Sequence, residues 1–131
     1  MDKEVKNASE LKNPTFWIAL KNSIRGIKLV IKSERNIKIQ LVFAILVTIL
    51  GFMFRISFVE WAVLAVTIFF VLVTEVLNTD VEKTVDIITD KYDECARNVK
   101  DISAGAVLFS AICSIIVGII IFLPKILVYI Y

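Results

Sequence analysis

The sequence of 131 residues contains no histidine and only four glycines. Without histidine, the chain has no histidine general base, no histidine metal ligand and no route through a phosphohistidine. The glycines are scattered, and neither a G-x-x-x-x-G-K-[ST] loop nor a G-x-G-x-x-G loop can be drawn around them. Any nucleotide chemistry must therefore use carboxylates and lysines carried on helices.

Cysteine and net charge are also low. Cys95 and Cys113 are the two cysteines, and they lack the spacing of a metal site. We expect both to be reduced thiols, because one faces the cytoplasm in the expected topology and the other lies in an apolar segment. The net charge of +2 gives no support for a nucleic-acid partner. Residues 1–12 are polar and are expected to form a flexible cytoplasmic tail without a signal peptide.

The sequence is instead rich in hydrophobic residues, which form long apolar segments. Hydrophobic residues make up 58% of the chain, against about 45–50% in a soluble domain. The pattern predicts a single-domain, all-α integral membrane protein with three transmembrane helices. The expected spans are residues 37–54, residues 58–77 with a helical extension to about residue 90, and residues 102–123. A tight turn at Arg55-Ile56-Ser57 separates the first two spans, and Pro124-Lys125 is expected to end the third.

Residues 14–33 predict a different kind of helix. Asn13 and Pro14 form a typical helix start. Lys21, Arg25, Lys28 and Lys32 then recur on one face, beside an apolar face that contains Trp17, Leu20, Ile24, Ile27 and Ile31. Such a basic amphipathic helix is typical of the membrane interface. The alternative is a helix that packs on a soluble partner.

Lysine and arginine predict the orientation. Nine of them lie in residues 1–38 and four in residues 79–101, whereas Arg55 and Lys125 are alone on the other side. The positive-inside rule places the N-terminus and the 78–101 segment in the cytoplasm and the C-terminus outside the cell membrane.

The chain is organised around a polar stripe that leaves the second span. Glu75, Asn78, Glu82 and Asp86 are spaced three, four and four residues apart, so a helix places them on one side. Acids at the edge of a membrane helix are costly without a function. The structural alternative is a protonated Glu75 and an Asn78 amide that hydrogen-bond across a helix interface.

This pattern, Glu-x-x-Asn-x-x-x-Glu-x-x-x-Asp, is followed by Lys100-Asp101 at the start of the next apolar segment. Together they resemble the prokaryotic diacylglycerol kinase and undecaprenol kinase family over about residues 15–125. Members are small integral-membrane enzymes that phosphorylate a lipid alcohol with ATP. Asp80 and Lys83 depart from the family pattern, and by helix angle both are expected to point away from the stripe.

The resemblance implies roles for individual residues. Glu75 matches the family's general base, and Glu34 and Glu82 match its Mg²⁺ ligands. The matches to nucleotide and phosphate contacts are Asn78, Asp86, Tyr92, Lys100 and Asp101. Other readings stay open: Glu34 could pair with Lys38, Asp86 could be a solvated acid, and Asp101 could cap the third span.

The resemblance also implies a homotrimer with each site shared between subunits. Small residues in the third span permit close helix contact, namely Ala104, Gly105, Ala106, Ser110 and Ala111. The expected partners are therefore the bilayer, ATP, a lipid alcohol and further copies of the chain.

The lipid is less well defined. The Lys-, Ile- and Asn-rich composition resembles Gram-positive members, for which undecaprenol is the usual substrate, and diacylglycerol is the alternative. Two other classes remain: a small proton- or cation-coupled transporter, whose ion site would be the intramembrane acid, and a purely structural membrane subunit. Neither explains the acids outside the hydrocarbon together with the basic helix.

Overall fold

The computed structural model describes residues 15–130. The expected tail at residues 1–12 and the helix start at Asn13 and Pro14 lie outside this range. Within it the chain forms four helices and no strand: α2 (Phe16–Ser33), α3 (Arg35–Met53), α4 (Phe58–Ile88) and α5 (Glu94–Ile130). Helix α2 forms one unit and the three longer helices form another. The all-helical prediction is confirmed.

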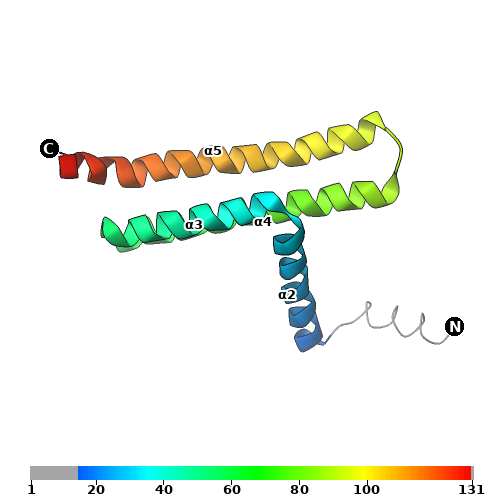
Figure 1. Ribbon diagram of the computed structural model, residues 1–131, viewed down its shortest axis with the longest axis horizontal. Helices are drawn as coiled ribbons and strands as arrows, with labels where there is room; N and C mark the ends of the chain where they lie inside the picture. The colour runs from blue at the N-terminus through cyan, green and yellow to red at the C-terminus, as the bar shows by residue number, and fades with distance from the viewer. Residues whose placement is uncertain (1–14, 131) are drawn as a thin grey trace. The chain divides into compact units, whose positions relative to one another are not determined.

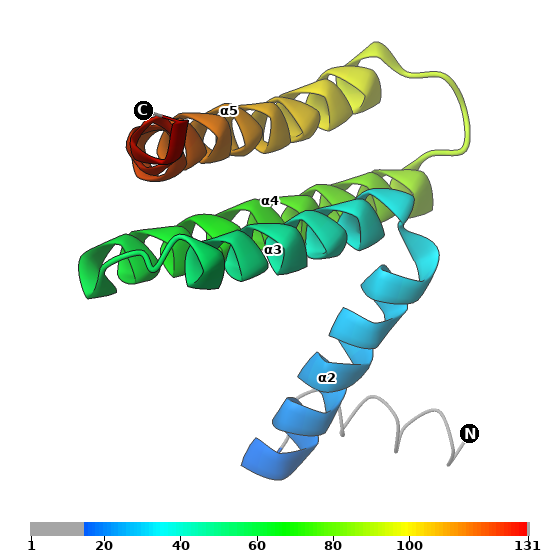
Figure 2. The ribbon, with the colours of Figure 1, turned by 60° about the vertical axis from the view of Figure 1, so that its left-hand side comes forward.

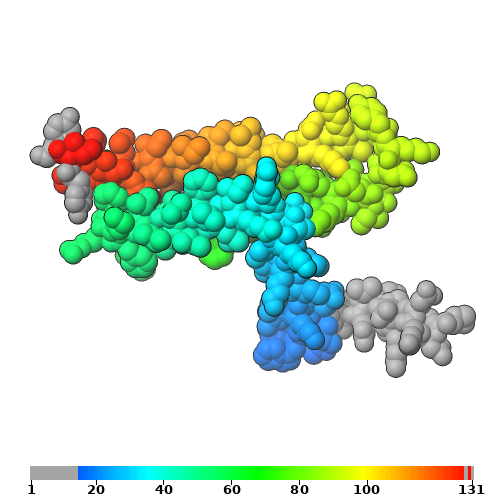
Figure 3. All heavy atoms as spheres, viewed as in Figure 1, coloured from blue at the N-terminus to red at the C-terminus, as the bar shows by residue number. Residues whose placement is uncertain are grey.

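Helix α4 runs antiparallel to α3 and to α5, and it packs against both of them (Figure 1). The view in Figure 2 separates α5 from the α3–α4 pair and shows the loop that joins α4 to α5 at one end. In Figure 3 the atoms of α5 form a row alongside the α3–α4 pair, and the helix that α5 packs against is α4. The polar stripe of α4 therefore has a neighbouring helix on either side.

All three helices are long and apolar enough to cross a membrane, as predicted. Helices α4 and α5 have 31 and 37 residues. At about 1.5 Å per residue they are about 46 and 55 Å long, whereas the hydrocarbon core of a bilayer is about 30 Å thick. Both helices therefore extend past the hydrocarbon, and most of their charged residues lie in these extensions.

The α3–α4 turn has the sharp form that was expected. Arg55 adopts a left-handed conformation with φ 48°. Ser57 and Glu60 then form a reciprocal capping box: the Glu60 amide donates to Ser57 Oγ at 3.3 Å, and the Ser57 amide donates to Glu60 Oε2 at 2.6 Å. Lys125 of α5 forms an ion pair with Glu60 at 3.0 Å and ties α5 to this end of the bundle.

The ends of α5 differ from the prediction. The helix begins at Glu94, where Asp93 Oδ1 accepts a hydrogen bond from the Ala96 amide at 2.8 Å. Asp101 is therefore not the N-cap of this helix; it lies in the second turn and pairs with Arg97 at 3.6 Å. Polar residues 94–101 extend the helix before the apolar segment, because Asp93 supplies a cap that periodicity does not reveal.

Helix α5 also runs past Pro124, where a helix end was expected. Proline removes one backbone donor and disfavours a helical residue before it. Membrane helices tolerate proline because neighbouring groups compensate for the lost hydrogen bond. The residue after it, Lys125, is held by Glu60.

A small apolar core closes this end of the bundle. It contains Ile56, Leu64, Ile121 and Phe122. Gly51 is buried beside it, against the ring of Trp61. A Cβ atom at Gly51 would lie 2.7 Å from Trp61 Cη2 and 3.1 Å from Ile56 Cδ1, so the turn packs closely only because no side chain is present there.

We expect Gly51→Ala to lower the thermal unfolding midpoint in detergent, because overpacking of this kind costs about 1–3 kcal/mol. Gly118→Ala is the matched control: a Cβ there meets no atom within 4 Å. Its midpoint should stay level or rise, since alanine favours a helix over glycine by about 1 kcal/mol. Equal midpoints for the two variants would contradict the close packing at Gly51.

Candidate functional site

The Glu75 carboxyl is buried among apolar helices. Its residue is 3% exposed and lies on α4, with exposed apolar side chains on either side of it in the sequence. Gln40, from α3, donates a hydrogen bond from Nε2 to Glu75 Oε2 at 3.0 Å. A carboxylate out of water is costly unless it is hydrogen-bonded, so this contact makes the placement tolerable.

One turn toward the loop end of α4, Asn78 and Glu82 form the next contact. Asn78 Nδ2 donates to Glu82 Oε1 at 3.0 Å across one helical turn. Asn78 is 9% exposed, and its Oδ1 accepts no hydrogen bond within the described part of the chain. Glu82 is half-buried and closer to the aqueous end of the helix. The stripe predicted from spacing is therefore continuous from Glu75 to Glu82.

Lys83, which was expected off the stripe, pairs with a charge from a neighbouring segment. Its ammonium lies 3.6 Å from Oε1 of Glu34, the residue just before α3. Asp80 is exposed.

A further polar contact lies between α4 and α5. Thr74 Oγ1 and Ser110 Oγ are 2.8 Å apart, and Ser110 is fully buried. Ser110 is one of the small residues that the sequence offered for contact with other copies. In the structure it contacts α4 of the same chain, and Thr74 precedes Glu75, so this contact anchors the Glu75 turn to α5.

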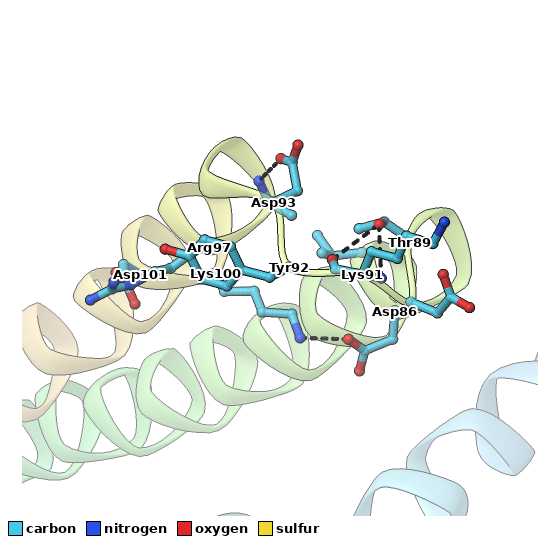
Figure 4. Close-up of a pocket in the computed structure, with 11 residues that line it drawn as sticks. Asp86, Thr89, Lys91, Tyr92, Asp93, Arg97, Lys100 and Asp101 are labelled. Carbon is cyan, nitrogen blue, oxygen red and sulfur yellow. Dashed lines mark hydrogen bonds and ion pairs between the residues drawn. The ribbon is translucent and has the colours of Figure 1, made fainter.

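Four of the five residues predicted to contact nucleotide or phosphate lie together at the loop end of α4 and α5, and Asn78 does not lie there. Asp86, Tyr92, Lys100 and Asp101 line one open pocket of about 510 Å³, a volume typical of small-molecule sites. Figure 4 shows Lys100 and Asp86 pointing toward each other from α5 and α4, where they form an ion pair. Tyr92 is 82% exposed in the connecting loop. Arg97 and Lys91 add further positive charge to the lining.

The predicted residues thus form two groups along α4. Four nucleotide candidates line the open pocket. Of the other four, Glu75 and Glu34 join α4 to the α3 side through Gln40 and Lys83, whereas Asn78 and Glu82 contact each other within α4. The described residues contain no cluster of three acidic or thiol groups that could hold a metal alone. Mg²⁺ usually takes one or two protein carboxylates and completes its shell with phosphate oxygens and water. The unpaired Asn78 Oδ1 adds another hard oxygen beside Glu82.

Comparison with known proteins identifies the family of this chain. The family profile of prokaryotic diacylglycerol kinase matches residues 21–122. The chain belongs to this family. It is 40% identical to undecaprenol kinase of Bacillus subtilis (strain 168), over 84% of this chain and 89% of that protein. It is 32% identical to a diacylglycerol kinase of Synechocystis sp., over 87% of this chain and 66% of that protein.

Family membership confirms the prediction of a membrane-bound lipid kinase. It also sets aside the transporter and the structural subunit. The pattern that led to this prediction, from Glu75 to Asp101, lies inside the matched region.

Sequence reasoning missed two residues of the site. Gln40 interrupts the first span, and a polar residue at such a depth is itself a functional signal. Lys83 departs from the family pattern, and its contact with Glu34 had no sequence signal, because it depends on how α3 lies against α4.

Proposed function

We propose that this chain transfers the γ-phosphoryl group of ATP to the hydroxyl group of undecaprenol, forming undecaprenyl phosphate and ADP. The observation that carries the proposal is the Glu75 carboxyl, buried in an apolar span with one hydrogen bond from Gln40. A proton acceptor at that depth suits a substrate whose hydroxyl stays in the bilayer. The 40% identity to undecaprenol kinase of Bacillus subtilis supports this lipid.

In the proposed reaction Glu75 is the general base. Its carboxylate takes the proton as the lipid oxygen bonds to the γ-phosphorus, and the bond from that phosphorus to the bridging oxygen of ADP breaks. Lys100 offsets the charge that develops on the transferring group. Asn78 orients the phosphate between Glu75 and Glu82, and Asp86, Tyr92 and Asp101 hold the nucleotide in the open pocket.

Glu82 and Glu34 are the proposed Mg²⁺ ligands. Bound there, the ion would supply positive charge that neutralises phosphate charge. Glu34 pairs with Lys83 at 3.6 Å, and Glu82 accepts a hydrogen bond from Asn78 Nδ2 at 3.0 Å.

The membrane placement completes the proposal. We place the loop end of α4 and α5 in the cytoplasm, where ATP is available, and the C-terminus outside. Helix α2, with its basic stripe and exposed apolar side chains, lies in the cytoplasmic interface of the cell membrane. Exposed apolar residues on all three spans face lipid or other copies of the chain.

A homotrimer is the proposed assembly. A single copy leaves the α4–α5 pocket open and places the nucleotide group and the buried Glu75 at different levels of α4. A second copy supplies another wall, and the small residues Ala104, Gly105 and Ala111 permit close helix approach.

Diacylglycerol is the second candidate substrate. The diacylglycerol kinase of Synechocystis supports it at 32% identity. Both lipids present one hydroxyl at the membrane interface, so the same residues serve either reaction.

Glu75→Gln should reduce turnover by about 10²–10⁴-fold, the usual contribution of a general base, with Mg-ATP affinity nearly unchanged. Glu82→Ala should instead weaken Mg-ATP binding, measured with a fluorescent ATP analogue. Asp80→Asn is the matched control, an exposed acid on the same helix, and should keep full activity. Equal activity of Glu75→Gln and the unmodified protein would refute the base assignment.

The lipid is tested by transfer of labelled phosphate from ATP to undecaprenol and dioleoylglycerol in separate mixed micelles. We expect label in undecaprenol. Preference for the glycerolipid would make diacylglycerol the substrate, and label in neither, with intact Mg-ATP binding, would point to another lipid alcohol.

The Lys100–Asp86 ion pair allows a charge exchange. Lys100→Met should reduce turnover strongly while changing stability by less than about 1 kcal/mol, because the pair is partly exposed. The double variant Lys100→Asp with Asp86→Lys restores a pair of opposite charges but moves the cation to α4. We expect it to remain inactive, and recovery of activity would show that the pair only joins the two helices.

A further inference from the structure

Gln40 stands out because of what it contacts. It is a polar residue six positions into α3, and its carboxamide reaches across to α4 and bonds Glu75 Oε2 at 3.0 Å. Glu75 is 3% exposed, so water has little access to that oxygen. Gln40 therefore gives the buried Glu75 carboxyl a hydrogen-bond donor from a different helix.

The other end of the same carboxamide is unmatched. Gln40 Oε1 is buried and accepts no hydrogen bond within residues 15–130. A buried acceptor without a partner costs about 1–3 kcal/mol. The side chain thus presents one satisfied donor and one unsatisfied acceptor beside a group that changes its own hydrogen bonding during turnover.

We propose that Gln40 is a positioning residue for Glu75, holding the carboxyl through both halves of the proton transfer. The inference rests on the proposed function, in which Glu75 is the base. As a carboxylate, Glu75 accepts from Gln40 Nε2. Once it has taken the lipid proton, its new O–H donates to Gln40 Oε1 after the carboxamide turns over about its terminal torsion.

The chemistry of the amide explains why glutamine suits this position. A carboxylate only accepts hydrogen bonds, whereas a carboxylic acid also donates one. A carboxamide carries both a donor and an acceptor at nearly equal reach, so it supplies one hydrogen bond in either state. A methionine of the same length supplies neither, and a glutamate places a second acid against Glu75.

Gln40 also lies away from the open pocket in which the nucleotide is proposed to bind. It is absent from the residues that line the open pocket, and its contact lies on the α3 side of α4 rather than between α4 and α5. Loss of its hydrogen bond should therefore affect the chemical step and leave Mg-ATP binding as it is.

The first test is the kinetics of Gln40→Met. We expect kcat to fall by about 10–100-fold, the range found when a residue that orients a reactive ligand is lost. The KM for Mg-ATP should stay within about twofold. Gln40→Glu should lose at least as much kcat, because two acids at this distance compete for one proton.

A matched control lies on the same helix. Thr48→Val removes the hydrogen bond from Thr48 Oγ1 to Ala44 O, 2.7 Å long, about two turns from Gln40. This variant should keep its kcat. A similar loss of kcat in both variants would mean that any polar deletion in α3 has the same effect, and would overturn the inference.

The deciding test is a double-mutant cycle with Glu75→Gln. If Gln40 acts through Glu75, adding Gln40→Met to Glu75→Gln should lower the residual rate by less than twofold. Additive losses would mean that Gln40 acts independently of Glu75, as a packing residue would. The infrared carboxyl band that disappears in Glu75→Gln should shift in frequency in Gln40→Met, and an unchanged band would argue against the contact.

These outcomes separate the two proposals. Full activity in Glu75→Gln overturns the proposed base and, with it, the role of Gln40. An inactive Glu75→Gln beside a Gln40→Met variant with unchanged kcat overturns the role of Gln40 alone.

Discussion

A carboxyl group inside an apolar span is the constraint on which the rest of this structure depends. Glu75 is tolerated there because α3 carries Gln40 at the matching height and because Thr74 and Ser110 fix the same turn of α4 to α5. Each of these two contacts forms only if α3 or α5 lies at one defined position along the axis of α4. The capped turn between α3 and α4 fixes the position of α3, and the Glu60–Lys125 ion pair fixes that of α5, both at the opposite end of the bundle from the α4–α5 loop. The packing of three helices is thus adjusted around one polar side chain.

The length of α4 places the proposed lipid and nucleotide sites at different positions along one helix. Because α4 is longer than the bilayer core is thick, one helix is long enough to hold the buried Glu75 within an apolar span and the exposed Asp86 beyond it. In the proposed mechanism, lipid and nucleotide bind at the two ends of this polar stripe, and neither has to enter the other's solvent. In the proposed reaction the phosphoryl group is transferred between them, near Asn78 and Glu82.

The three spans, the polar stripe and the family were predictable because each depends on periodicity or composition along one segment. The contacts between segments were not. Gln40 was visible as an interruption of the first span, but its pairing with Glu75 depends on the axial offset of α3 against α4, which no single-helix pattern contains. The partner of Lys83, Glu34, could not be predicted for the same reason. Asp101 was taken for a helix cap because hydrophobicity begins there, whereas Asp93 begins the helix two turns earlier.

The depth of Glu75 has a consequence for how the enzyme meets its substrate. In the proposed reaction the base lies on a membrane-spanning helix, so the enzyme meets its lipid by lateral diffusion in two dimensions. The quantity that sets its rate is then the mole fraction of the lipid alcohol in the membrane, not its amount per volume of solution. Inert phospholipid acts as a diluent of the reaction, and the same number of substrate molecules is phosphorylated more slowly in a larger membrane.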